Sequence, residues 1–183
     1  MSSLKELTSE KHKEAEEQPF LKSIFAGNVD KEKYTSYLFQ LLMLYSPLEQ
    51  YADNHGIFAG IRGAKRTKLI EKDWLELSGS MFVQGEIKNS TINYINYLTT
   101  IKDDKHKLLA HIYVRHLGDM FGGQMLAKLL PGSNNMFKFD DLPKYLNGVR
   151  SQLDLSMAEE ANKAFDFNIE MIKEYNDGSL ATS

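Results

Sequence analysis

The chain has 183 residues, of which 42% are apolar and 26% charged, and its formal net charge of −3 gives no reason to expect nucleic acid as a partner. It contains no cysteine, which excludes disulfides and thiolate chemistry and suits a reducing cytoplasm. Because the N-terminus is too polar for a secretory signal and no run approaches about 18 apolar residues, we expect a soluble cytoplasmic protein with no membrane span.

Apolar residues recur at helical spacing along most of the chain, and convincing strand alternation is absent. In chain order, the predicted helices cover residues 3–17, 31–52, 65–77, 91–101, 104–130, 142–153 and 157–175, with a loop at 132–138. The candidate N-cap residues are Asp30, Ser90, Asp141 and Ser156, and Pro47 predicts a kink. The pattern therefore predicts one all-α domain of seven or eight helices over residues 1–176, followed by a disordered tail at 177–183.

The segment YVRHLGDMFGGQ places Gly118, Gly122 and Gly123 inside the helix predicted over 104–130. Three such glycines cost about 3 kcal/mol in helix propensity, a large part of the roughly 5–15 kcal/mol by which a domain is stable. Glycine lets the backbone approach something that a side chain would block. Close packing against another helix is one account, and a ligand is another, favoured by Asp119 in the same turn.

Several polar residues of this helix allow two interpretations. Arg115 and Asp119 are four residues apart and can form a surface ion pair, but an aspartate facing a cavity can hold ordered water and pass protons. His111 and His116 are expected to be structural. Elsewhere in the chain, a tyrosine such as Tyr45 can bury its ring and still offer its hydroxyl to a partner.

His12 lies on the first predicted helix, beside small or polar residues that leave space for a flat ligand. Neutral imidazole is a common metal ligand and the usual proximal ligand of haem iron in several families. From periodicity alone, an exposed or buried histidine without such a role is the commoner case. Lys5, Lys144 and Arg150 can likewise bind ligand carboxylates or simply be solvated.

Taken together, these segments resemble the haem oxygenase family of the biliverdin-producing type. LKELTSEKHKEAEEQPFL is similar to the proximal helix of that family, with His12 at the iron-ligand position. AHIYVRHLGDMFGGQ is similar to its distal helix, whose glycines let the helix bend over the haem. A weaker match, EEANKAFDFNIEMI, includes Phe165 and Asn168. The resemblance spans Leu4 to Tyr175 and implies a helical bundle with haem between a proximal and a kinked distal helix.

The resemblance also implies roles for single residues. His12 would be the iron ligand with Glu16 as its partner, and Asp119 would anchor a proton-delivering water network supported by Tyr45 and Arg115. Lys5 and Tyr113 would meet the haem propionates. The full set of implied haem contacts is Lys5, Thr8, Ala15, Glu16, Tyr113, Gly118, Gly122, Gly123, Lys144, Arg150 and Phe165.

Two positions depart from the family pattern. In KYLNGVRSQL, Asn147 stands where an arginine is expected, and Lys144 or Arg150 can substitute for it. Phe121 replaces a small polar residue and is expected to make the distal side bulkier or more apolar. Propionate anchoring and the site of ring opening therefore stay open.

The implied reaction uses haem b as both substrate and cofactor, and O2 as co-substrate. The resemblance implies opening of the ring at a meso carbon, expected to be the α position, to biliverdin, Fe2+ and CO. The chain has no flavin motif, so electrons would come from a ferredoxin or a flavin reductase, docked through Lys5, Lys11, Lys144 and Arg150. A bilin reductase would be a partner downstream, and we expect a monomer.

Two alternatives to the enzyme remain at this point. A non-catalytic haem carrier or sensor would keep His12 and the bent helix without turnover. A helical phosphotransfer module would use one exposed histidine but would leave the three glycines unexplained. A related helical fold that hydrolyses thiamin-like compounds uses a cysteine, which this chain lacks.

Overall fold

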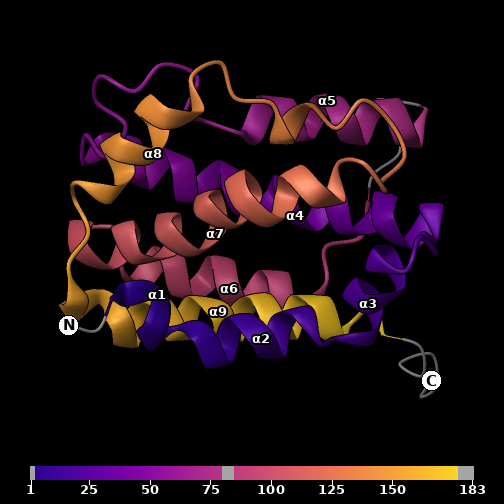
Figure 1. The fold of residues 1–183 in the computed structure, drawn as a ribbon, viewed down its shortest axis with the longest axis horizontal. Coiled ribbons are helices and arrows are strands. Elements are labelled where there is room, and N and C mark those ends of the chain that lie inside the picture. Colours follow the sequence, from indigo (N-terminus) through magenta and orange to yellow (C-terminus); the bar gives the residue numbers. More distant parts are fainter. Residues whose placement is uncertain (1–2, 80–84, 177–183) are drawn as a thin grey trace.

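The computed structural model describes residues 3–79 and 85–176, and within these ranges it contains helices and no strand (Figure 1). The helices are α1 (Leu4–Leu7), α2 (Ser9–Glu16), α3 (Pro19–Phe25), α4 (Lys31–Asn54), α5 (Thr67–Ser78), α6 (Asn89–Thr100), α7 (Lys105–Leu126), α8 (Leu142–Arg150) and α9 (Ala158–Lys173), with short 3-10 helices η1 (Asn135–Phe137) and η2 (Leu155–Met157). The predicted all-α fold is confirmed. The predicted disordered tail, 177–183, lies outside the described residues.

Three aspartates start the helices that matter most for the site. The carboxylates of Asp30, Asp104 and Asp141 accept hydrogen bonds from backbone N–H groups in the first turns of α4, α7 and α8, respectively. The predicted caps Ser90 and Ser156 are wrong. α6 already begins at Asn89, so Ser90 lies inside that helix. Ser156 lies inside η2, where its backbone N–H donates to the carboxylate of the capping residue Asp154.

The predicted helix at 3–17 is divided in two at Thr8. The Thr8 backbone leaves the helical region, and its hydroxyl donates to the Leu4 carbonyl oxygen at 3.0 Å. A separate helix, α3, follows at Pro19, where proline occupies the first helical position. α7 ends at Leu126 rather than at residue 130, while α4 continues through Pro47.

The helices form layers that place α7 in the interior (Figure 1). α4 and α7 cross the middle of the molecule, α2 packs along α9 on one side, and α5 packs on α4 on the other. The most deeply buried core side chains include Leu38, Leu44, Leu48, Ile70, Leu98, Leu108 and Ile112. No helix in the described ranges is long and apolar enough to cross a membrane.

Candidate functional site

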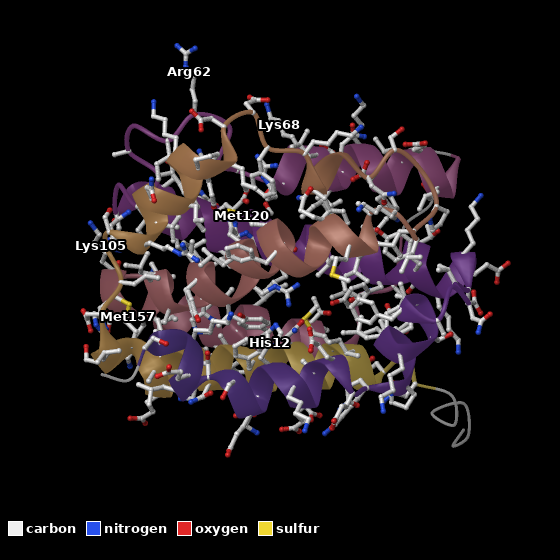
Figure 2. All side chains as sticks on the ribbon, in the orientation of Figure 1. His12, Arg62, Lys68, Lys105, Met120 and Met157 are labelled. Carbon is white, nitrogen blue, oxygen red and sulfur yellow. The ribbon has the colours of Figure 1, made fainter. Side chains whose placement is uncertain are left out.

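His12 is presented on the inner side of α2, toward α7 (Figure 2). Its side chain is 55% exposed, and its Nδ1 lies 3.7 Å from Oε2 of Glu16, one turn further along α2. The ring of Phe165 meets the imidazole edge-on, with ring centroids 5.9 Å apart. Because Nδ1 faces Glu16, Nε2 is the ring nitrogen left to bind a ligand.

The helix that carries His12 is held against α9 and α7 by other residues. Thr8 and Ala15 are buried, and the Thr8 hydroxyl lies 3.5 Å from the hydroxyl of Tyr113 on α7. On the outside, Lys11 pairs with Asp166 of α9 at 2.8 Å. Lys11 also pairs with Glu14 within α2. The helix is therefore fixed in place by contacts that leave the imidazole uncovered.

Two of the three glycines of α7 face open space. A Cβ atom built on Gly118 or Gly122 would have no atom within 4 Å, apart from the helix's own nearby backbone. Gly123 differs, because a Cβ there would collide with the ring of Phe137. Internal packing therefore accounts for Gly123, whereas nothing inside the described protein accounts for Gly118 and Gly122.

The loop that carries Phe137 is anchored from behind by α5. Both oxygens of Asp73 accept backbone N–H bonds, from Asn135 and Met136, each at 2.8 Å. The Arg66 guanidinium donates to the Lys138 carbonyl at 2.6 Å. This loop fills the notch at Gly123 and supports the buried side of the glycine segment.

Met125 on the open face of α7 and Leu129 in the turn that follows the helix were not identified from the sequence. Positions 118, 122, 125 and 129 follow helical spacing on one face. Met125 is 63% exposed and Leu129 is 40% exposed, which is high for large apolar side chains. The spacing from the glycines would have been enough to identify them.

Phe121 sits at the edge of this face. Its side chain is 51% exposed, and the Arg150 guanidinium of α8 lies 5.4 Å from its ring centroid. Lys144 is also exposed, at the other end of α8, and Lys5 is exposed on α1. Lys5, Lys144 and Arg150, the three residues predicted to bind carboxylates, are therefore all exposed to solvent.

Asp119 is joined to α4 rather than to a surface partner. The hydroxyl of Tyr45 donates to Asp119 Oδ2 at 2.5 Å. Arg115 is buried and donates to Asn168 of α9, and its guanidinium lies 5.4 Å from the Tyr45 ring. The surface ion-pair interpretation of Arg115 and Asp119 is therefore wrong, since Arg115 is not at the surface.

Burial dominates the electrostatics of this group. Burial raises the pKa of Asp119, while the positive charge of Arg115 and the hydrogen bond from Tyr45 hold that pKa down in part. Burial and the nearby Asp119 charge raise the pKa of Tyr45 well above its ordinary value, so its hydroxyl remains a donor. Asp119 is thus a carboxyl that holds a proton closer to neutral pH than an exposed aspartate does.

His111 and His116 are both fully buried, as expected for structural histidines. His111 lies 2.7 Å from the Tyr94 hydroxyl and 3.0 Å from Glu160. His116 contacts the Tyr145 hydroxyl through Nδ1 and lies 3.1 Å from Glu49 through Nε2. Neither ring faces the open side of α7.

The residues present fit a flat, metal-centred ligand. α2 offers a half-exposed imidazole with one nitrogen available. α7 offers two positions where a missing Cβ leaves space, with a partly buried carboxyl one residue after Gly118.

Comparison with known proteins gives one consistent result. A family model described as heme oxygenase matches residues 1–142. A heme oxygenase of Porphyra purpurea is 30% identical, over 94% of this chain and 85% of the relative. The crystal structure of heme oxygenase-1 from the cyanobacterium Synechocystis in complex with heme superposes with a TM-score of 0.84 at 27% identity, over 97% of this chain and 91% of that one. Heme oxygenase-2 from the same organism, with heme and NO, gives 0.82 at 29% identity, over 94% and 83% of the two chains.

Proposed function

Because this chain belongs to the heme oxygenase family, we propose that it opens haem at the α-meso carbon to biliverdin, Fe2+ and CO, with O2 and external electrons. The observation that carries the proposal is the pairing of an uncovered imidazole on α2 with open backbone at Gly118 and Gly122 on α7. Bound haem supplies the iron at which O2 is activated and the ring edge that is oxidised.

On the proximal side, His12 would hold the iron through Nε2. A carboxylate near Nδ1 favours the tautomer with its hydrogen on Nδ1, which leaves the Nε2 lone pair for the metal. The 3.7 Å separation from Glu16 suits this role. Phe165, Thr8 and Ala15 would border the same side, since they line the junction of α2 with α9 and α7.

On the distal side, Gly118 and Gly122 would let the α7 backbone lie directly over the ring. Asp119 would hold ordered water and pass protons to the reacting centre, which its raised pKa supports. Tyr45 orients the carboxylate through its hydrogen bond, and Arg115 supplies a buried positive charge beside it. Gly123 would contribute indirectly, because its missing Cβ leaves the space that the Phe137 ring occupies against α7.

The haem propionates would be held by the exposed cations and by Tyr113. Lys5 and Tyr113 are carried by α1 and α7, and Lys144 and Arg150 by the two ends of α8. Arg150 is the better substitute for the family arginine missing at Asn147, because its guanidinium already lies beside the open face, over Phe121.

Electrons would come from a ferredoxin or a flavin reductase, and a bilin reductase would take the product. Exposed Lys5, Lys144 and Arg150 suit docking of an acidic ferredoxin. Lys11 contributes less than the sequence suggests, because Asp166 and Glu14 already pair with it.

The decisive experiment adds hemin to the protein, then ascorbate or reduced ferredoxin in air. We expect a Soret band that decays into the broad red absorption of biliverdin, with one regioisomer on chromatography. The same mixture without reductant is the control and should keep its Soret band. A stable Soret band under reductant and O2 would favour a haem carrier or sensor and contradict the proposal.

A further inference from the structure

His116 lies directly behind the residue that orients Asp119. Its ring is fully buried in a stack of nearly parallel rings, at 16° to Tyr45, 21° to Phe58 and 12° to Tyr145. The centroid of Tyr45 is 5.4 Å from that of His116. The position of the Tyr45 ring, and therefore of its hydroxyl, is set in part by this neighbour.

The His116 ring has a hydrogen bond at Nδ1 and a close charged neighbour at Nε2. Nδ1 meets the hydroxyl of Tyr145 on α8, and Nε2 lies 3.1 Å from Oε1 of Glu49 on α4. The contact between Nε2 and Glu49 does not have hydrogen-bond geometry, so the hydrogen bond is the one at Nδ1. Turning the ring about its Cβ–Cγ bond would break that buried hydrogen bond, which is costly. Its plane is thus fixed more firmly than packing alone would fix it.

Glu49 is itself immobilised. It accepts hydrogen bonds from the backbone N–H of Arg66 at 2.5 Å and from the backbone N–H and hydroxyl of Thr67 at 3.0 and 2.6 Å. Although burial opposes it, the contacts with His116 and these donors lower the pKa of Glu49, so the carboxylate stays charged. A rigid support therefore runs from the start of α5 through Glu49 to His116.

We propose that His116 is a positioning residue: held by Glu49 and Tyr145, its ring fixes the Tyr45 ring so that the Tyr45 hydroxyl meets Asp119. This inference rests on the proposed function, because it gives Asp119 a reason to be oriented. Asp119 follows His116 by three residues on α7, yet the link between them runs through α4.

Several charged and titratable groups surround His116, and one of them, Asp119, can report on the position of the Tyr45 ring. They are Tyr45 and Glu49 on α4, Arg66 before α5, Asp119 on α7 and Tyr145 on α8. The hydrogen bond from Tyr45 lowers the pKa of Asp119. A displaced Tyr45 ring should therefore raise the titration midpoint of the Asp119 carboxyl.

The test measures that midpoint by 13C NMR in the haem-free protein labelled at aspartate, with the Asp119 signal assigned by its loss in Asp119→Asn. Tyr45→Phe should raise the midpoint by about one pH unit, the size expected for one lost hydrogen bond to a carboxylate. His116→Phe keeps a flat ring but loses both nitrogen contacts, and should shift the midpoint in the same direction. The double variant should match Tyr45→Phe alone, because His116 acts through Tyr45.

His111→Phe is the matched control, since His111 is an equally buried histidine on α7 with a hydroxyl and a carboxylate as partners. It should lower the melting temperature and leave the Asp119 midpoint unchanged. If His116→Phe does not fold, Tyr145→Phe removes only the hydroxyl on Nδ1 and should give a smaller upward shift.

Additive shifts in the double variant, or no shift in either folded variant, would overturn the inference. They would mean that His116 acts by its charge alone or only by stabilising the fold. Failure of the proposed function would look different, because it would appear as wild-type protein that makes no biliverdin from haem.

Discussion

At the residue scale, Asp119 combines partial burial with a single strong orienting contact. An exposed aspartate would be fully ionised and hydrated at neutral pH, whereas the pKa of Asp119 is raised by burial and restrained by Tyr45 and Arg115. This balance lets one carboxyl keep an ordered water in place and exchange protons with it.

Asp119→Ala is expected to keep haem binding but lower the biliverdin yield by roughly 100-fold, the size of a typical acid–base contribution. The Soret titration gives the affinity for haem, and product chromatography gives the yield. Asp103→Ala, at an exposed aspartate, is the control and should behave as wild type. An unchanged yield in Asp119→Ala would remove Asp119 from the reaction.

His12→Ala should lose the iron–imidazole signature of the ferrous haem complex in resonance Raman spectra. The reason is that His12 is the one histidine of α2, Ser9–Glu16, so the variant leaves no imidazole on that helix. Added imidazole should restore the signature by filling the space that the side chain leaves. His106→Ala, at an exposed histidine distant in sequence, should have no effect. If an intact signature persisted in His12→Ala without added imidazole, His12 would not be the ligand.

At the element scale, α7 has two faces with opposite demands on glycine. Gly118 and Gly122 lie where an added methyl group meets nothing in the described protein, and Gly123 lies where it meets Phe137. The same residue type therefore serves a ligand on one side of the helix and internal packing on the other.

Alanine substitutions separate these two uses. In the haem-free protein, Gly118→Ala and Gly122→Ala should raise the free energy of unfolding by up to about 1 kcal/mol through helix propensity, while haem affinity falls. Gly123→Ala should lower the free energy of unfolding by about 1–3 kcal/mol through overpacking. Denaturant unfolding and hemin titration measure the two effects. Equal stability changes at the three positions would contradict the assignment.

The helices were predictable from the sequence where periodicity and caps agree. Asp30 and Asp141 start α4 and α8 as predicted, because a carboxylate before an apolar repeat satisfies free N–H groups. The break at Thr8 was not predictable, since it depends on the threonine hydroxyl bonding to the Leu4 carbonyl one turn earlier.

The candidate site was predictable only where a local motif carries it. His12 and the glycine segment stand out in the sequence, and the structure leaves His12, Gly118 and Gly122 uncovered. The support of Tyr45 by His116 and Glu49 depends on residues from α4 and α7 that are 67 and more positions apart, and no local pattern reveals it. The sequence did not distinguish Gly123 from Gly118 and Gly122, because the packing of Phe137 against Gly123 appears only in the structure.

At the scale of the whole molecule, buried titratable groups make stability depend on pH. Burial lowers the pKa of His111, so the folded protein keeps this ring neutral. The unfolded chain takes up a proton there below about pH 6.5, and stability from this group falls as pH drops. Glu49 and Glu160, whose pKa values are also lowered, add a loss at lower pH, while the raised pKa of Asp119 acts in the opposite direction.

The contribution of His111 can be isolated by comparison with His111→Gln. The free energy of unfolding of the wild type should exceed that of the variant most at pH 7.5, and the difference should narrow toward pH 5. Urea unfolding at each pH gives the difference directly. A constant difference across this range would show that His111 does not titrate on unfolding.

Electron delivery is also a property of the whole surface. If an acidic ferredoxin docks on Lys5, Lys144 and Arg150, its reduction of the bound haem should slow as salt rises from about 0.01 to 0.3 M, because screening shortens the reach of surface charges. Turnover supported by ascorbate is the control and should change little. Salt-independent turnover with ferredoxin would contradict electrostatic docking.

The loop at residues 134–138 ties the site to the order in which the chain folds. Asp73 and Asn135 are 62 positions apart, so their contact closes a long segment and forms late relative to single helices. Until it closes, Phe137 cannot occupy the notch at Gly123, and the glycine segment has no support behind it. We therefore expect a nascent or partly unfolded chain to contain most of its helices before it can capture haem.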